Sequence, residues 1–273
     1  MLLNPDFQFS QSSLQDYSDC PRRFELKYIR RMAWPALQSE PVLERERQME
    51  LGQKFHRLVH QHHLGITPDV LSLQSNDPDL GSWWQSYLQC NPLDSLPLLR
   101  LPEYTLRAPF AGFRLIAKFD LLAIEPGLRA VIIDWKTARF RSSQSTLRKR
   151  IQTRLYPFVL AAAGAVLNGG VPLSPSQIQM MYWFPEFPDR PEQILYSIAQ
   201  FEEDRYFLQK QVEEICTHSA GAFWMAEDEK RCLYCEYRSY CGRGCKAGCM
   251  EDDGEFSSES IEIDFGQLEG TAF

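Results

Sequence analysis

The sequence contains no long hydrophobic run. The longest, residues 156–167, has 12 residues, whereas a helix needs about 20 to cross a bilayer. Residues 1–6 also lack the basic start and the apolar stretch of a secretion signal. We therefore expect a soluble cytoplasmic protein that is not secreted and does not bind membranes. Without a signal peptide, disulfide bonds are not expected among its eight cysteines.

Basic residues are absent from the end of the chain. Residues 251–273 carry eight acidic side chains and no basic one, while the remaining residues carry 28 acidic and 29 basic side chains. The formal charge of −7 therefore comes from the tail and does not exclude a nucleic-acid partner for the body. We interpret residues 1–250 as one folded domain. Residues 251–273 are predicted to be an acidic disordered tail and a candidate docking segment for a protein partner.

Hydrophobic periodicity and turn residues divide the body into alternating helices and strands. A capped helix is predicted after Ser10 or Ser12, with a turn at Cys20-Pro21. Further helices are predicted at 41–64, 83–88, 145–167 and 201–217, and strands at 103–108, 113–124, 130–135, 177–184 and 193–200. This order predicts an α/β fold in which helices pack on a sheet, followed by a C-terminal cysteine module.

Two carboxylates and a lysine fall at the ends of neighbouring predicted strands. Asp134 and Lys136 are two residues apart, so in a strand they face the same side, and Asp120 lies on the preceding strand. Two carboxylates can hold Mg²⁺ or Mn²⁺, and a nearby lysine can orient a water or neutralise developing charge. Taken alone, the pattern is a weak signal and is more typical of a salt bridge at a strand end.

Residues on two predicted helices add to this group. His56 lies on the 41–64 helix with Gly52 one turn before it, where a glycine allows close approach of another chain segment or a ligand. Its imidazole could bind a metal. Because His60, His62 and His63 lie on the same helix, a histidine at this position is weak evidence for a metal site by itself. Gln152 and Tyr156 are four residues apart and share a helix face.

Positive charge is concentrated just after Lys136, and no acidic residue occurs within 135–185. These side chains are candidates for binding a phosphodiester backbone, or they form a solvated helix face: Arg139, Arg141, Arg148, Lys149, Arg150 and Arg154. Phe140, Tyr182, Trp183 and Phe184 are candidates for stacking bases, although strand aromatics more often belong to a core.

The cysteines gather near the C-terminus. Cys232, Cys235 and Cys241 have a spacing typical of a metal site, and local spacing alone favours zinc, with Cys245 or Cys249 as the fourth ligand. Cys90 and Cys216 are interpreted as ordinary buried thiols.

Taken together, these residues resemble the PD-(D/E)XK nuclease superfamily in its RecB-type branch. The matching segments are Gly52-Gln-Lys-Phe-His56, Asp120, Asp134-Trp-Lys136 and Gln152-Thr-Arg-Leu-Tyr156. The resemblance implies a restriction-endonuclease-like mixed sheet flanked by helices. It further implies that His56, Asp120, Asp134 and the Trp135 carbonyl bind Mg²⁺ or Mn²⁺ and that Lys136 is the catalytic lysine. Gln152 and Tyr156 would contact the scissile strand or position the lysine.

A second resemblance concerns the N-terminal cysteine. The segment Asp19-Cys20-Pro21-Arg22-Arg23-Phe24 is similar to the first-cysteine motif of iron–sulfur members of that branch, the AddB-like and CRISPR-associated exonuclease-like proteins. It implies a [4Fe–4S] cluster held by Cys20, Cys232, Cys235 and Cys241. Zinc remains the alternative, and Cys245 or Cys249 could replace one ligand.

The sequence thus predicts a metal-dependent deoxyribonuclease. The expected reaction is phosphodiester hydrolysis of DNA with single-stranded ends, of exonuclease or flap type, in DNA repair and recombination or in CRISPR adaptation. Two alternatives stay open, a non-catalytic DNA-binding iron–sulfur or zinc subunit of a nuclease or helicase complex, and a zinc-stapled interaction module.

Overall fold

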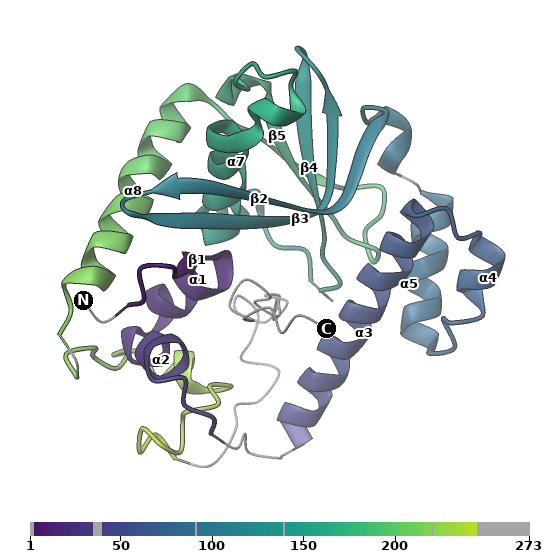
Figure 1. Cartoon of the computed structure of the whole chain (residues 1–273). Helices are drawn as coiled ribbons and strands as arrows, with labels where there is room; N and C mark the ends of the chain where they lie inside the picture. The colour runs from purple at the N-terminus through teal and green to yellow at the C-terminus, as the bar shows by residue number, and fades with distance from the viewer. Residues whose placement is uncertain (1–2, 35–39, 91, 139, 220, 245–273) are drawn as a thin grey trace, which may run out of the picture.

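A mixed six-stranded sheet forms the centre of the computed structural model, which describes residues 3–34, 40–90, 92–138, 140–219 and 221–244 (Figure 1). The strand order is β1-β3-β4-β5-β6, and β2 pairs with β3. Parallel pairs (β1 with β3, β4 with β5) alternate with antiparallel ones. The strands are β1 (Gln8–Phe9), β2 (Leu99–Phe110), β3 (Phe113–Glu125), β4 (Arg129–Trp135), β5 (Ile178–Trp183) and β6 (Glu192–Leu195).

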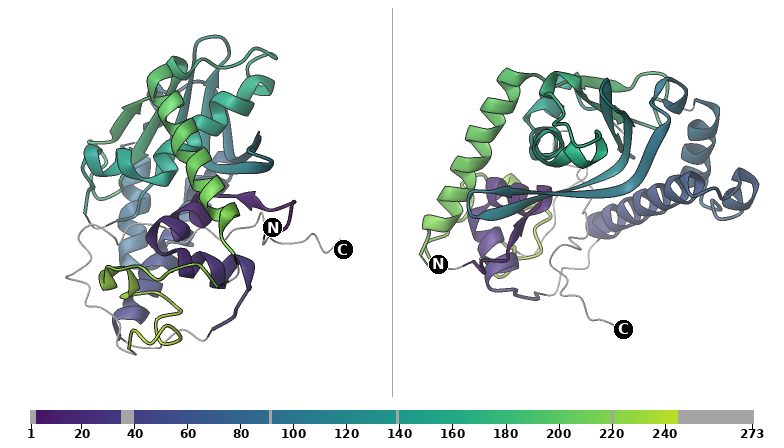
Figure 2. Two further views of the ribbon diagram at one scale, coloured as in Figure 1. Left: turned by 90° about the vertical axis from the view of Figure 1, so that its left-hand side faces the viewer. Right: turned by 45° about the horizontal axis from the view of Figure 1, so that its top comes forward.

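Helices cover both faces of this sheet (Figures 1 and 2). They are α1 (Gln11–Asp19), α2 (Pro21–Phe24), α3 (Glu40–His63), α4 (Pro68–Ser72), α5 (Pro78–Gln89), α6 (Gln144–Lys149), α7 (Ile151–Ala163) and α8 (Ile198–Thr217). Helices α7 and α8 pack on one face, and α3 and α5 pack on the other. This arrangement confirms the predicted mixed α/β architecture. None of the helices in the described part of the chain has the length and hydropathy needed to span a membrane.

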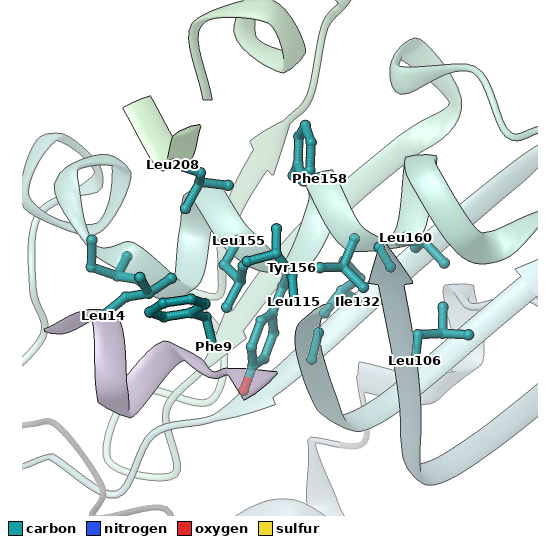
Figure 3. Packing of buried hydrophobic residues seen from close by; sticks show 14 of the residues in the cluster. Phe9, Leu14, Leu106, Leu115, Ile132, Leu155, Tyr156, Phe158, Leu160 and Leu208 are labelled. Atoms are coloured by element: carbon teal, nitrogen blue, oxygen red, sulfur yellow. The ribbon is translucent and has the colours of Figure 1, made fainter. Parts of the chain in front are cut away.

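Two hydrophobic clusters hold the layers together. The larger one, shown in Figure 3, joins the sheet to α1, α7 and α8 through residues such as Phe9, Leu115 and Leu155. The smaller one joins the opposite face to α3 and α5 and is rich in tryptophan, with Trp83, Trp84 and Trp183 each at most 2% exposed. Burial of this apolar surface is the main driving force that fixes the helices against the sheet.

Local sequence signals explain most element boundaries. The Ser10 hydroxyl accepts a hydrogen bond from the Ser13 N–H at the start of α1, which confirms the first of the two predicted caps. Helix α3 matches the prediction for 41–64, and Gly65 follows it with a φ of +93°. Asp77 caps α5 and Pro78 occupies its first turn, so this helix is longer than the predicted 83–88.

Two further predicted elements differ from the structure, and one strand was not predicted. The single helix predicted at 145–167 is two helices, because Arg150 is extended (φ −68°, ψ 143°) and both ends α6 and begins α7. The strand predicted at 193–200 ends at Leu195, because the Ser197 side chain accepts the Gln200 N–H and starts α8 there. Strand β1 was not predicted, because two residues carry no detectable alternation.

Strand pairing in the long β2–β3 hairpin is interrupted next to Asp120 of β3. Phe119 packs into the larger cluster, as does Leu122, so the in–out alternation of β3 changes phase between them, at Asp120. On β2 the facing residue Glu103 has a φ of +53° and is missing from an otherwise continuous pairing. The local distortion leaves the Asp120 carboxylate free to reach the neighbouring strand β4.

Candidate active site

The two predicted carboxylates meet where the β3–β4 ladder ends. Its last pair is Leu121 with Ile133, which places Asp120 and Asp134 at the next opposing position. Asp120 Oδ2 accepts the Trp135 N–H at 2.9 Å, so this carboxylate takes the place of the next ladder carbonyl. The position is set by strand pairing and not by a flexible loop, which favours an ordered site.

Lys136 and Asp134 point to the same side, as their spacing predicts, and Gln152 of α7 closes the group. Lys136 Nζ lies 2.9 Å from Asp134 Oδ2 and donates to Gln152 Oε1 at 3.0 Å. Gln152 Nε2 in turn donates to Asp134 Oδ1 at 2.5 Å. All three residues are buried, so the lysine ammonium is held in one place by two charged or polar partners.

His56 reaches the same point from α3, on the other face of the sheet. Its Nε2 lies 2.8 Å from the Trp135 carbonyl oxygen, and its Nδ1 lies 3.4 Å from Asp120 Oδ1. The side chains of His56 and Asp120 are 22% and 13% exposed, whereas those of Asp134 and Lys136 are 4% and 5% exposed. Solvent and substrate therefore approach the site on the His56 side.

Gly52 explains how α3 comes close enough for His56 to reach the site. A Cβ on Gly52 would lie 2.7 Å from the Thr137 hydroxyl oxygen, well inside van der Waals contact. Thr137 directly follows Lys136 along the chain. The expected close approach at Gly52 is therefore made by the segment after β4, and any larger side chain would push the two apart.

The two carboxylates differ in protonation behaviour. Burial raises the pKa of Asp134, and the charge of Asp120 adds to this despite the opposing charge of Lys136. For Asp120, burial is outweighed by the charge and hydrogen bond of His56 and by the Trp135 N–H, so its pKa lies below the ordinary value. Burial also disfavours the His56 imidazolium, but Asp120 outweighs it and raises the pKa of His56 to about 9.

The donor set fits a hard divalent cation. Within the described part of the chain, no three His, Cys, Asp or Glu side chains already form a metal-binding group. The two carboxylates, one imidazole and one carbonyl nevertheless converge, and mutual repulsion helps to raise the pKa of Asp134. A cation between Asp120 and Asp134 would offset that repulsion. Oxygen-rich sets of this kind suit Mg²⁺ or Mn²⁺.

Tyr156 and three of the aromatic residues named from the sequence lie in the core. Tyr156 is 1% exposed and its ring packs edge-to-face on Phe119 at 5.3 Å, within the larger hydrophobic cluster. Lys118 forms an ion pair with Glu103. Tyr182, Trp183 and Phe184 are buried, which supports the core interpretation over base stacking.

The predicted basic surface separates into two kinds of residue. Arg148 and Lys149 are exposed at the end of α6. Arg141 pairs with Glu192, and Arg150 donates to the Ser142 hydroxyl at 3.3 Å. Arg154 pairs with buried Asp204 at 2.8 Å and lies over the Phe207 ring, so the structure favours a structural role for it instead of DNA binding. Arg139 lies outside the described residues.

Sequence reasoning missed two partners of the site. The Trp183 carbonyl accepts the Lys136 N–H at 2.9 Å, which extends the β4–β5 pairing past the last strand residue and fixes the lysine backbone. Thr137 is the contact of Gly52. Pairing between residues 48 positions apart has no local sequence signal, although Gly52 itself indicated that another segment approaches closely.

A second group of candidate residues lies at the junction of the chain ends. Cys20, Cys232, Cys235 and Cys241 line one small pocket together with Arg23, Arg231 and Arg238. Burial raises the pKa of Cys235 to about 11 and also raises the pKa values of Cys232 and Cys241. Thiols so placed need a metal ion to become thiolates, and nearby arginines favour the resulting negative charge. The four thiols therefore share one pocket, although within the described part of the chain they do not already form a metal-binding group; Cys245 and Cys249 lie outside the described residues.

Several hydrogen bonds besides this pocket tie the C-terminal module to the N-terminal segment. Arg231 donates to the Ser18 carbonyl and pairs with Asp19 at 2.9 Å. The Tyr237 hydroxyl donates to the Met32 carbonyl at 2.9 Å. Cys90 and Cys216 do not line the pocket and are partly buried, in line with ordinary thiols.

Comparisons with known proteins place this geometry in context. The chain is similar to the crystal structure of a candidate exonuclease from Eubacterium rectale, with a TM-score of 0.50, 11% identity, and coverage of 81% of this chain and 85% of that one. The crystal structure of SSO0001 gives a TM-score of 0.38 at 12% identity, covering 86% of each chain. A search of curated proteins gave no significant match.

The family comparison covers most of the chain. The model described as "PD-(D/E)XK nuclease superfamily" matches residues 8–242, a range that includes every described residue of the active site and the four pocket cysteines. The mixed sheet flanked by helices is the restriction-endonuclease-like fold of this family. The chain therefore belongs to the PD-(D/E)XK nuclease superfamily.

Proposed function

We propose that this nuclease is a metal-dependent deoxyribonuclease that hydrolyses phosphodiester bonds in DNA with single-stranded ends. The observation that carries the proposal is the convergence of Asp120, Asp134 and Lys136 at one strand end, with His56 and Gln152 arriving from opposite faces of the sheet. Five residues spread over about a hundred positions form two adjacent contact sets, Asp134 with Lys136 and Gln152, and His56 with Asp120 at the Trp135 backbone, which a chance strand-end salt bridge does not require.

In this proposal each residue has a distinct role. His56, Asp120, Asp134 and the Trp135 carbonyl would hold Mg²⁺ or Mn²⁺. The bound ion supplies Lewis-acid polarisation of a phosphoryl oxygen and a lowered pKa for a bound water. Lys136, fixed by Asp134 and Gln152, presents its ammonium group to the attacking water or to the negative charge that develops on phosphorus oxygens. Gln152 acts through the lysine and is a positioning residue.

The substrate preference rests on the resemblance to the RecB-type branch and on the exposed basic end of α6. Arg148 and Lys149 are oriented to solvent near the start of α7, the helix that carries Gln152. Cationic side chains there favour a polyanionic backbone through counterion release. Exonuclease or flap-type action on single-stranded ends, in DNA repair and recombination or in CRISPR adaptation, is the form of this activity that we propose.

We further infer that Cys20, Cys232, Cys235 and Cys241 hold a [4Fe–4S] cluster that joins the chain ends. Support comes from their shared pocket, which includes the N-terminal cysteine that a local zinc site of residues 232–245 would omit. Four thiolates suit such a cluster. Zinc held by the same four cysteines is the alternative, and visible absorbance with metal analysis separates the two.

The decisive experiment is a cleavage assay on the full chain purified without oxygen. Single- and double-stranded DNA, labelled at the 5′ or the 3′ end, is incubated with Mg²⁺, with Mn²⁺ or with EDTA. We expect cleavage of single-stranded ends with either metal and none with EDTA. Binding without cleavage by a protein that retains its iron would favour the non-catalytic DNA-binding subunit instead.

A further inference from the structure

Two aromatic side chains lie side by side on the surface next to the cysteine pocket. Of the six tryptophans, four are at most 2% exposed, whereas Trp34 is 36% exposed. Its ring centre lies 5.1 Å from that of Tyr240, which is 37% exposed, at an angle of 65°. Two accessible rings held together in this way offer a surface on which a flat ligand can stack.

The pair is held in place from both ends of the chain. The Trp34 indole N–H donates to the Ser239 hydroxyl at 2.8 Å, so its polar atom is already satisfied. The Tyr237 hydroxyl donates to the Met32 carbonyl, which fixes the segment before Trp34. Tyr240 immediately precedes Cys241 of the cysteine pocket. The rings are therefore ordered in advance, which lowers the entropic cost of binding a ligand.

A positive charge with no ion pair among the described residues lies three residues before Trp34. Arg31 is exposed and has a φ of +47°, a left-handed conformation that is costly for a residue other than glycine. Such outliers concentrate at binding sites, where the surrounding structure enforces them. The neighbouring cations Lys27 and Arg30 pair with Asp16 and Glu25, whereas among the described residues Arg31 forms no ion pair.

We propose that Trp34, Tyr240 and Arg31 form a binding surface for single-stranded DNA, separate from the catalytic end of the sheet. Bases would stack on the two rings and a phosphate would pair with Arg31. Stacking on aromatic rings tolerates any sequence, which suits a nuclease that acts on single strands. The inference rests on the proposed function, because it names where a strand of the DNA substrate is held away from the site of cleavage.

Placement supports a role in guiding a strand. The segment that follows α2 and the start of α3 lie at the same end of the molecule, below the sheet in Figure 1 and in the rotated views of Figure 2. Helix α3 carries His56. A strand held at the aromatic pair therefore lies at the end of the molecule from which α3 runs to the active site. The surface would add affinity only to strands long enough to reach both places.

The test measures binding of fluorescently labelled single-stranded oligonucleotides to the full chain in EDTA, where no cleavage occurs. Trp34→Leu and Tyr240→Leu should each weaken the Kd for a long oligonucleotide about tenfold, since each base stacked on an aromatic ring contributes substantially. Trp34→Phe, which keeps a ring, should stay close to wild type. Tyr206→Leu, which removes an exposed ring of α8, is the matched control and should have no effect.

The dependence of the Kd on salt and on oligonucleotide length distinguishes base stacking from charge pairing. The two leucine variants should leave the slope of log Kd against log salt unchanged, whereas Arg31→Gln should reduce it by about one phosphate contact. The difference between wild type and Trp34→Leu should disappear for the shortest oligonucleotides that still bind. Visible absorbance and thermal unfolding of each variant establish that the cluster and the fold are intact.

Three results would overturn the inference. Wild-type affinity in Trp34→Leu and Tyr240→Leu, with DNA cleavage intact, would remove the binding surface and leave the proposed function standing. An equal loss of DNA affinity in Trp34→Phe and Trp34→Leu, with the fold intact, would show that stacking on the ring does not cause the binding. Absence of any DNA binding or cleavage by the wild-type protein would remove the proposed function as well.

Discussion

The catalytic end of the sheet and the cysteine pocket both gather residues that are far apart in the sequence, but they are held together differently. Asp134, Lys136 and Gln152 bond to one another, and the strands and helices that carry them are fixed by two large hydrophobic clusters. In the pocket, four thiols face one another, and burial raises the pKa values of Cys232, Cys235 and Cys241.

The difference shows two ways of building a site. The catalytic group is organised by strand pairing and packing, so its geometry exists before any ligand binds. Several hydrogen bonds join the cysteine module to the N-terminal segment, but the module lies largely outside the hydrophobic clusters, apart from Phe223. Its order therefore depends in part on what the thiols bind, as in small metal-dependent modules. We expect changes at the first site to alter activity with the fold intact, and changes at the second to alter local folding.

The largest effect is expected for Lys136→Ala. Removing the ammonium group should lower Mg²⁺- or Mn²⁺-dependent cleavage by about 10²–10³-fold, the usual effect of one electrostatic catalytic group. Circular dichroism should still show a folded chain, because the hydrophobic clusters are untouched. Lys118→Ala, which removes a lysine of β3 that pairs with Glu103, is the control and should cleave DNA normally. Cleavage by Lys136→Ala at the wild-type rate would show that the active site lies elsewhere.

The next effect should appear in the cysteine module. Cys20→Ser should abolish iron binding and expose residues 218–244 to protease, because this thiol links the N-terminus to the C-terminal cysteines. Iron analysis, visible absorbance and limited proteolysis measure the change. Cys216→Ser alters a thiol outside the pocket and should retain both iron and protease resistance. Full iron content in Cys20→Ser would remove Cys20 from the ligand set.

A smaller effect should follow from moving α3 against the sheet. Gly52→Ala places a methyl group against the Thr137 hydroxyl and should displace His56, lowering cleavage by about 10- to 100-fold. Thermal stability should change little, since alanine favours the helix. Adding Thr137→Ala makes room for the methyl group and should restore most of the activity. A double variant no better than Gly52→Ala would show that this contact does not position His56.

The smallest effect concerns pH and the half-buried His63 at the end of α3. Burial, helped by the charges of His62, Arg100 and His60, lowers the pKa of His63 to about 4. Between pH 6.5 and 4 the unfolded chain binds a proton at this position that the folded chain does not, so stability falls as the pH falls through this range. Urea unfolding at pH 7.5 and 5.5 should show this loss, and His63→Gln should reduce it.

His218→Gln removes an imidazole that is not among the groups acting on His63 and serves as the control for that measurement. It should leave the loss of stability between pH 7.5 and 5.5 close to that of the wild-type chain. An equal loss in the wild-type chain and in His63→Gln would show that His63 does not cause the pH dependence.

The sequence by itself determined the local parts of this protein. The cap at Ser10, the stop at Gly65, the long helix α3 and the three central strands all follow from signals within a few residues of each element. The two-residue spacing of Asp134 and Lys136 also fixed their common orientation, because side chains alternate along a strand. These features depend on short-range sterics and hydrogen bonds, which neighbouring residues decide.

Only the tertiary structure decided which of these helices and strands contact one another. The break at Arg150, the contact of Gly52 with Thr137 and the bond from Lys136 to the Trp183 carbonyl join segments whose approach depends on the packing of both faces of the sheet. In the sequence Arg154 is equivalent to Arg148, but in the structure it forms an ion pair with Asp204 of α8. Non-local contacts of this kind result from the burial of the whole core, and no single stretch of sequence encodes them.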